Sequence, residues 1–121
     1  MSHAPLRVLI VEDDPDSARM LRVLLKRSGY ETRVEHDGAA VLAAAREFRP
    51  GVVLLDQTLE GMSGSEVAAQ LRAAPELDGC AILAVSGHAS ADLPDPAAFD
   101  EHFPKPIDHD SLLAYLARAS G

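Results

Sequence analysis

The feature that most constrains the fold is a run of four apolar residues followed by an acid, Val52 to Asp56. The run is too short for a helix and rich in branched side chains, which predicts a strand buried on both faces in the centre of a parallel sheet. Gly61 and Gly64 then turn the chain into a helix that begins near Ser63. Asp56 is therefore expected at the end of a buried strand, where open α/β sheets bind their ligands.

A second apolar run, residues 6–11, brings more acids to the same edge of the sheet. It is followed by Glu12, Asp13 and Asp14. A single Asp at a strand end is more often a cap or a turn former. If the two strands are parallel neighbours, however, three or four negative charges converge, which is unfavourable unless protons or a hard cation neutralise them. Because Mg²⁺ prefers oxygen ligands, we infer a divalent metal site at this edge.

Length and charge limit the classes of protein to consider. The 121 residues suffice for one domain without disulfides, and the single Cys80 cannot form an internal bridge. We expect a cytoplasmic protein that does not bind membranes, since no apolar run approaches twenty residues. Eleven basic and nineteen acidic residues give a net charge of −8. This charge disfavours nucleic acid as a ligand, so protein partners are expected.

Hydrophobic periodicity predicts five strands that alternate with helices. Strands are expected at 6–11, 31–35, 52–55, 81–85 and 102–103, and helices after Asp14, after Asp37, near Ser63 and after Asp108. This alternation requires right-handed crossovers and a parallel sheet. The weakly apolar second strand and the short fifth strand are natural edges. We therefore predict a doubly wound, flavodoxin-like α/β fold with strand order 2-1-3-4-5, which places the acids on strands one and three in one crevice.

The segment between strands four and five has little helical periodicity. Pro94 and Pro96 each lack an amide donor and disfavour helix in the residue before them. We expect at most one turn, capped by Asp95 and leading to Phe99, whose ring would cover the core. The fourth helix of the fold is thus predicted to be shortened or irregular.

Five landmarks at the strand ends resemble the receiver domain of two-component response regulators. In the family's order they are Glu12-Asp13, Asp56, Gly64, Ser86 and Lys105-Pro106. Taken singly, Ser86 would more often be a turn residue and Lys105 a solvated surface charge. Together they make a specific combination that covers essentially the whole chain, which we interpret as a single receiver domain over residues 1–121.

The resemblance implies a phosphoryl acceptor and a metal. Asp56 would accept a phosphoryl group from the phosphohistidine of a histidine kinase or a phosphotransfer protein. Mg²⁺ is the implied cofactor, with Asp13 and Asp56 as direct ligands and the carbonyl of Thr58 as a backbone ligand. Glu12 would act on the metal through a water molecule.

The resemblance also implies roles for the residues that follow strands four and five. Lys105 would pair with the phosphoryl oxygens, and Ser86 would donate its hydroxyl to one of them. The bond between Lys105 and Pro106 is expected to be cis. His102 stands where the family often carries an aromatic or histidine switch residue that moves when Ser86 engages the phosphoryl group. A partly buried spectator is the alternative interpretation of His102.

Some positions depart from the family's pattern. Glu60 stands where a proline is common and adds negative charge near the pocket. Gly87 replaces a more usual alanine, which should widen access to the phosphoryl site. Pro104 cannot donate a strand hydrogen bond, which is tolerable only on an edge strand. Since the fourth helix, strand five and the last helix form the family's common dimerisation face, the irregular segment predicts a monomer or a pair formed through another surface.

Three classes of function are compatible with these residues. The leading interpretation is a stand-alone signalling switch, not an enzyme in the ordinary sense, because the chain ends at Gly121 without an effector domain. The alternative is a phosphorylation-independent interaction module, although the intact acids, Ser86 and Lys105 argue against it. The third is an aspartyl-phosphate hydrolase, which typically carries a second Asp where this chain has Thr58.

Overall fold

The computed structural model describes residues 5–57, 59, 62–87 and 98–120. Its five strands are β1 (Arg7–Val11), β2 (Glu31–Glu35), β3 (Val52–Asp56), β4 (Ala81–Ser86) and β5 (Glu101–Pro104). All neighbouring strands are parallel and their order is β2-β1-β3-β4-β5. This confirms the predicted doubly wound sheet, with β2 and β5 as its edges.

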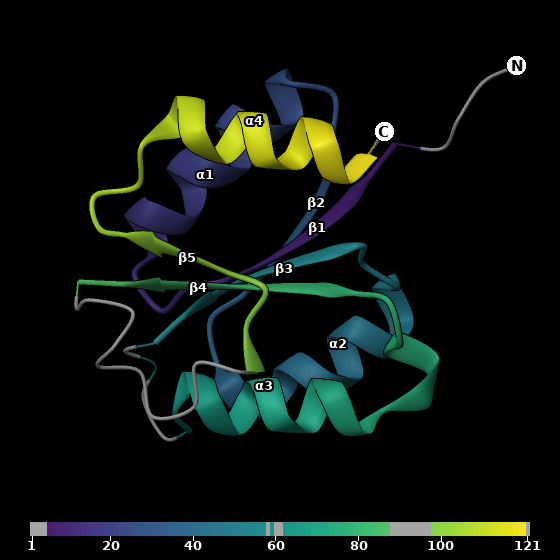
Figure 1. Ribbon diagram of the computed structural model, residues 1–121. Coiled ribbons are helices and arrows are strands. Elements are labelled where there is room, and N and C mark those ends of the chain that lie inside the picture. Colours follow the sequence, from purple (N-terminus) through teal and green to yellow (C-terminus); the bar gives the residue numbers. More distant parts are fainter. Residues whose placement is uncertain (1–4, 58, 60–61, 88–97, 121) are drawn as a thin grey trace, which may run out of the picture.

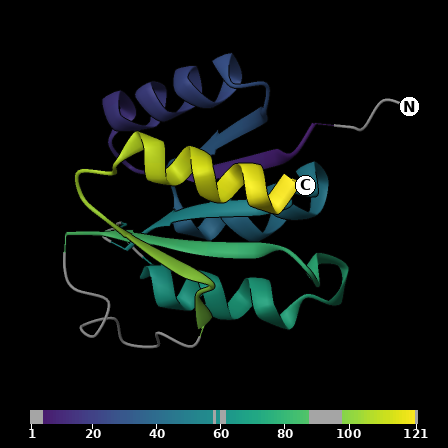
Figure 2. The same cartoon turned by 45° about the horizontal axis from the view of Figure 1, so that its top comes forward.

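Four α-helices are described, α1 (Pro15–Arg27), α2 (Val41–Phe48), α3 (Gly64–Ala73) and α4 (His109–Ser120), with 3-10 turns η1 (Gly38–Ala40) and η2 (Pro75–Leu77). Helices α1 and α4 cover one face of the sheet, and α2 and α3 cover the other (Figure 1). The turned view in Figure 2 shows the same three layers. None of the described helices is long and apolar enough to cross a membrane.

Alternating strand residues build a separate core on each face. Leu9 and Val11 of β1 pack with α2 and α3 residues such as Val67. Ile10, one position away, packs with Leu112 of α4 on the other face. This alternation is the period of two that a strand imposes on its side chains. Every residue of β3 is buried, as expected for the central strand.

The α-helices begin where the sequence predicts, with one correction. Asp14 caps α1 by accepting a hydrogen bond from the Ser17 amide at 3.2 Å, and Ser63 caps α3 in the same way. Asp37 caps η1 rather than α2, because the chain makes a 3-10 turn before the helix.

Arg72, near the end of α3, fixes the segment that leads into β5. Its guanidinium donates to the carbonyls of Ala98 and Cys80, both at 3.1 Å, and to Asp100 Oδ2 at 2.6 Å. The same Asp100 oxygen accepts the Ile82 amide at 2.7 Å. Three separate parts of the chain are thereby held together before β5 begins.

The predicted irregular fourth helix depends on residues 88–97, which lie outside the described residues. Immediately after them, Ala98 and Phe99 pack against the core cluster on the α2 and α3 face. Strand β5 is longer than predicted and includes Pro104. Since β5 is an edge strand, the missing amide donor of Pro104 is tolerated, as expected.

Candidate functional site

The site begins where β1 and β3 end side by side. Val11 pairs with Leu55 in the β1 and β3 register, so the residues that follow, Glu12 and Asp56, leave the sheet next to each other. Together with Asp13 they offer carboxylate oxygens that all lie within 4.8 Å of one another. The predicted convergence of acids from two strands is therefore present in the fold.

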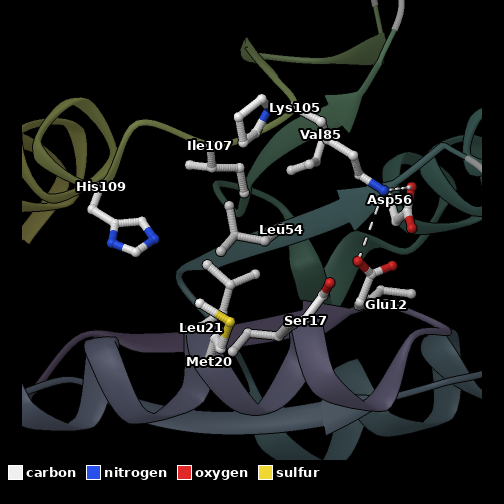
Figure 3. A pocket seen from close by; sticks show the side chains of 13 residues that line it. Glu12, Ser17, Met20, Leu21, Leu54, Asp56, Val85, Lys105, Ile107 and His109 are labelled. Atoms are coloured by element: carbon white, nitrogen blue, oxygen red, sulfur yellow. Dashed lines mark ion pairs between the residues drawn. The ribbon is translucent and has the colours of Figure 1, made fainter.

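Lys105 brings one positive charge to these acids from the end of β5. Its backbone amide donates to the Ser86 carbonyl at 2.9 Å, which ties it to β4. Its Nζ lies 3.2 Å from Asp56 Oδ1 and 3.8 Å from Glu12 Oε1 (Figure 3). The Lys105 to Pro106 bond is cis, as expected.

The two buried carboxylates strongly influence each other. Only 8% of the Glu12 side chain and 3% of the Asp56 side chain are exposed. The pKa of Glu12 is raised to about 8, chiefly by burial and then by the hydrogen bond and negative charge of Asp56, while the charge of Lys105 opposes the shift. Glu12 Oε2 is buried and finds no hydrogen-bond partner among the described residues. The cluster therefore carries more negative charge than its protein surroundings compensate, which suits a hard cation with oxygen ligands.

Two contacts that position the acids were not anticipated from the sequence. The Gln57 amide group donates to the Leu55 carbonyl at 3.1 Å and folds over Gly64, where any Cβ would collide with it. His36 Nδ1 lies 2.9 Å from the Glu12 carbonyl, beyond the end of β2. Neither contact has a local sequence signature, since each depends on the register of neighbouring strands or on a side chain that folds back.

The remaining predicted residues lie near this cluster or outside the described residues. Ser86 is fully buried, one position after Val85, the register partner of Asp56. His102 lies opposite Ala84 in the register of β4 and β5, and its Nε2 is buried with no hydrogen-bond partner in the described part of the chain. Both interpretations of His102 stay open. Thr58 lies outside the described residues.

Known proteins share this arrangement. A family model for the response regulator receiver domain matches residues 8–117. The chain is 37% identical over 108 residues to the DNA-binding response regulator MtrA of Mycolicibacterium smegmatis. That match covers 89% of this chain and 47% of the relative, so the chain spans about half the length of such relatives.

Solved structures agree with the family match. A CheY-like response regulator receiver domain from Methylobacillus flagellatus superposes with a TM-score of 0.87 at 32% identity, covering 96% of this chain and 99% of that one. The receiver domain of sensor histidine kinase PA1611 from Pseudomonas aeruginosa, described with a magnesium ion coordinated in its active site cleft, gives a TM-score of 0.84 at 25% identity. It covers 98% of this chain and 99% of that one. Sequence and fold together show that the chain belongs to the response regulator receiver domain family.

Proposed function

We propose that this protein is a phosphorylation-dependent signalling switch in which Asp56 accepts a phosphoryl group from a phosphohistidine. The observation that carries the proposal is the placement of Lys105 Nζ 3.2 Å from Asp56 Oδ1, beside two further acids. An Asp56 oxygen attacks phosphorus, the nitrogen–phosphorus bond of the donor breaks, and the imidazole leaves with the electron pair. Lys105 then pairs with the oxygens of the new acyl phosphate.

The acid cluster fits Mg²⁺, which would be held by Asp13, Asp56 and the Thr58 carbonyl, with Glu12 acting through water. The compact set of carboxylate oxygens and the uncompensated Glu12 support this assignment. When bound, the cation offsets the charge of the phosphoryl oxygens. Ser86 would donate its hydroxyl to one of these oxygens, and His102 would respond as the switch residue.

The family relation supports a histidine kinase or phosphotransfer protein as donor and a downstream protein as the target of the switch. Relatives such as MtrA are named as DNA-binding regulators, but this chain spans only about half of their length. For the domain itself, the net charge of −8 favours a protein target over nucleic acid. Its monomeric state and its cytoplasmic location remain predictions.

Labelling with acetyl phosphate and Mg²⁺, followed by intact mass measurement, tests the proposal. One added phosphoryl group is expected on the wild type, none on Asp56→Asn, and much slower labelling on Asp13→Asn. Asp14→Asn is the matched control, because Asp14 caps α1 and asparagine caps equally well. Stoichiometric labelling of Asp56→Asn would remove Asp56 as acceptor. A wild type that binds Mg²⁺ but is never labelled would instead favour the phosphorylation-independent module.

A further inference from the structure

Gln57 follows the proposed acceptor Asp56 and makes hydrogen bonds from both its backbone and its side chain. Its backbone amide donates to the Val85 carbonyl of β4 at 3.0 Å. Its side-chain Nε2 turns back and donates to the Leu55 carbonyl at 3.1 Å. The second bond spans Asp56, because it joins the residues immediately before and after that acid. The main chain that carries the Asp56 carboxylate is therefore braced both from β4 and from its own strand.

The same side-chain amide also contacts the first residue of α3. Gly64 is buried and begins that helix, directly after the cap Ser63. A Cβ on Gly64 would lie 2.6 Å from Gln57 Cδ, closer than unbonded carbon atoms pack. Gly64 is not among the glycines with a positive φ, so alanine would fit its backbone conformation. The Gln57 amide, rather than the backbone, is thus what requires a residue without a side chain at position 64.

These contacts bring the two ends of the connection between β3 and α3 together. Asp56 stands at the first end and Gly64 at the second. Thr58, whose carbonyl is the expected backbone ligand of Mg²⁺, stands between them in the sequence. A segment whose ends are held in place loses less conformational freedom when it binds a cation. The Gln57 amide therefore acts on the part of the chain that carries two of the expected ligands.

We propose that Gln57 is a positioning residue for the cation site, because its side-chain amide lies between the Leu55 carbonyl and Gly64 and thereby orients Asp56 and the chain that follows. The inference rests on the proposed function, in which this segment binds Mg²⁺. The Gln57 side chain acts through the backbone and not as a ligand. Its contribution is therefore to the affinity of the site for the cation.

The expected effect separates cation binding from phosphorylation. Without the amide, Asp56 samples more orientations in the free protein, and the cation has to order them. Gln57→Ala should therefore raise the dissociation constant of Mg²⁺ roughly threefold to tenfold, the range that one neutral hydrogen bond gives. Once bound, the cation itself holds the same ligands. The labelling rate at saturating Mg²⁺ should accordingly change by less than about twofold.

Calorimetric titration with Mg²⁺ measures the affinity without any phosphorylation. Labelling with acetyl phosphate over a range of Mg²⁺ concentrations then measures the rate at saturation. Gln70→Ala is the matched control, because it removes the same side chain from an exposed position of α3. This control should keep the wild-type affinity. Melting curves in EDTA show whether each variant is folded.

Gly64→Ala tests the same contact from its other side. The new methyl group takes the place of the Gln57 amide, which lies at the end of a flexible side chain and can move away while the backbone stays in place. Gly64→Ala should therefore weaken Mg²⁺ binding as much as Gln57→Ala does. In the double variant the methyl group displaces nothing. Its affinity should equal that of either single variant, so the two losses are not additive.

The outcomes separate this role from the proposed function. Wild-type Mg²⁺ affinity in Gln57→Ala would overturn the positioning role and leave the function of Asp56 intact. Losses that add up in the double variant would overturn it as well, since Gln57 and Gly64 would then act separately. A saturated labelling rate that falls as much as the affinity would contradict an effect confined to cation binding. A wild type that binds no Mg²⁺ would instead contradict the proposed metal site, and the inference with it.

Discussion

Two carboxylates of this fold, Asp100 before β5 and Glu12 after β1, differ in how many hydrogen-bond donors surround them. Asp100 Oδ2 accepts the Ile82 amide at 2.7 Å and the Arg72 guanidinium at 2.6 Å, although 43% of its side chain is exposed. Glu12 is only 8% exposed, yet its nearest cation is 3.8 Å away and Oε2 has no hydrogen-bond partner among the described residues. The carboxylate with less access to water has fewer donors.

The difference distinguishes a structural acid from an acid in a site. A buried polar group without partners destabilises a protein, so folds normally complete such groups with their own donors. Asp100 receives hydrogen bonds from Arg72 and Ile82 in this way, and it holds the start of β5. Glu12 Oε2 has no such donor in the described part of the chain, which is the electrostatic basis for expecting a cation. Four predictions, from the largest expected effect to the smallest, test this comparison.

Replacing Glu12 by glutamine should stabilise the metal-free protein by about 2 to 4 kcal/mol at pH 8. The pKa of Glu12 rises from 4.5 to about 8 on folding. The folded state therefore binds more protons than the unfolded state between these values, and the stability of the wild type falls as pH rises through this window. Below about pH 4.5 the two proteins should be equally stable.

Urea unfolding in EDTA at pH 5 and pH 8 measures this difference. Glu12→Gln should show a smaller loss of stability between the two pH values than the wild type. If both proteins lose stability equally, Glu12 is compensated within the fold and the contrast with Asp100 fails.

Mg²⁺ should stabilise the unmodified wild type by about 2.7 kcal/mol at a hundred times its dissociation constant, if it binds only the native state. The cation relieves the repulsion among Glu12, Asp13 and Asp56. Thermal melts with and without Mg²⁺ check this. Asp13→Asn should lose most of the shift, whereas Asp14→Asn should keep it, because Asp14 lies outside the three-acid cluster. An equal shift in both variants would mean that the ion binds elsewhere.

The sequence was sufficient to predict the parts of the fold that depend on local pattern. The apolar run that ends in Asp56 and the similar run before Glu12 identify two central strands, and the order of the sheet then places their acids together. The weakly apolar strand at 31–35 is an edge, as predicted. These features are encoded in neighbouring residues, so periodicity and chain order suffice to read them.

Contacts between distant side chains could not be predicted in the same way. Arg72 and Asp100 are 28 positions apart, and nothing near either residue signals their ion pair. The hollow of about 490 Å³ beside Lys105 depends on how α1 packs against the connection from β5 to α4, which no local motif specifies. The error at Asp37 has a different cause, because the sequence predicts a helix directly after Asp37 and gives no sign of the 3-10 turn that precedes α2.

Replacing Arg72 by methionine should destabilise the protein by about 1 to 3 kcal/mol, since hydrogen bonds from a charged group are lost and their acceptors are left incomplete. Methionine keeps the helix propensity and much of the apolar stem. Asp100→Asn should lose less, because an amide oxygen still accepts the Ile82 amide. Urea unfolding compares the wild type with both variants. If Arg72→Met is as stable as the wild type, Asp100 is held by the Ile82 amide alone.

The smallest effect is expected for Arg46→Met. Arg46 lies in the last turn of α2, as Arg72 lies in the last turn of α3. Arg46 pairs with Glu76 at 3.3 Å, but the two side chains are 53% and 35% exposed. Water already solvates both charges, so the pair should contribute no more than about 0.5 kcal/mol. Urea unfolding of Arg46→Met beside Arg72→Met decides between two explanations of the Arg72 effect. Similar losses would mean that any arginine at a helix end stabilises this fold, whereas a loss confined to Arg72 would assign the effect to its completed network with Asp100.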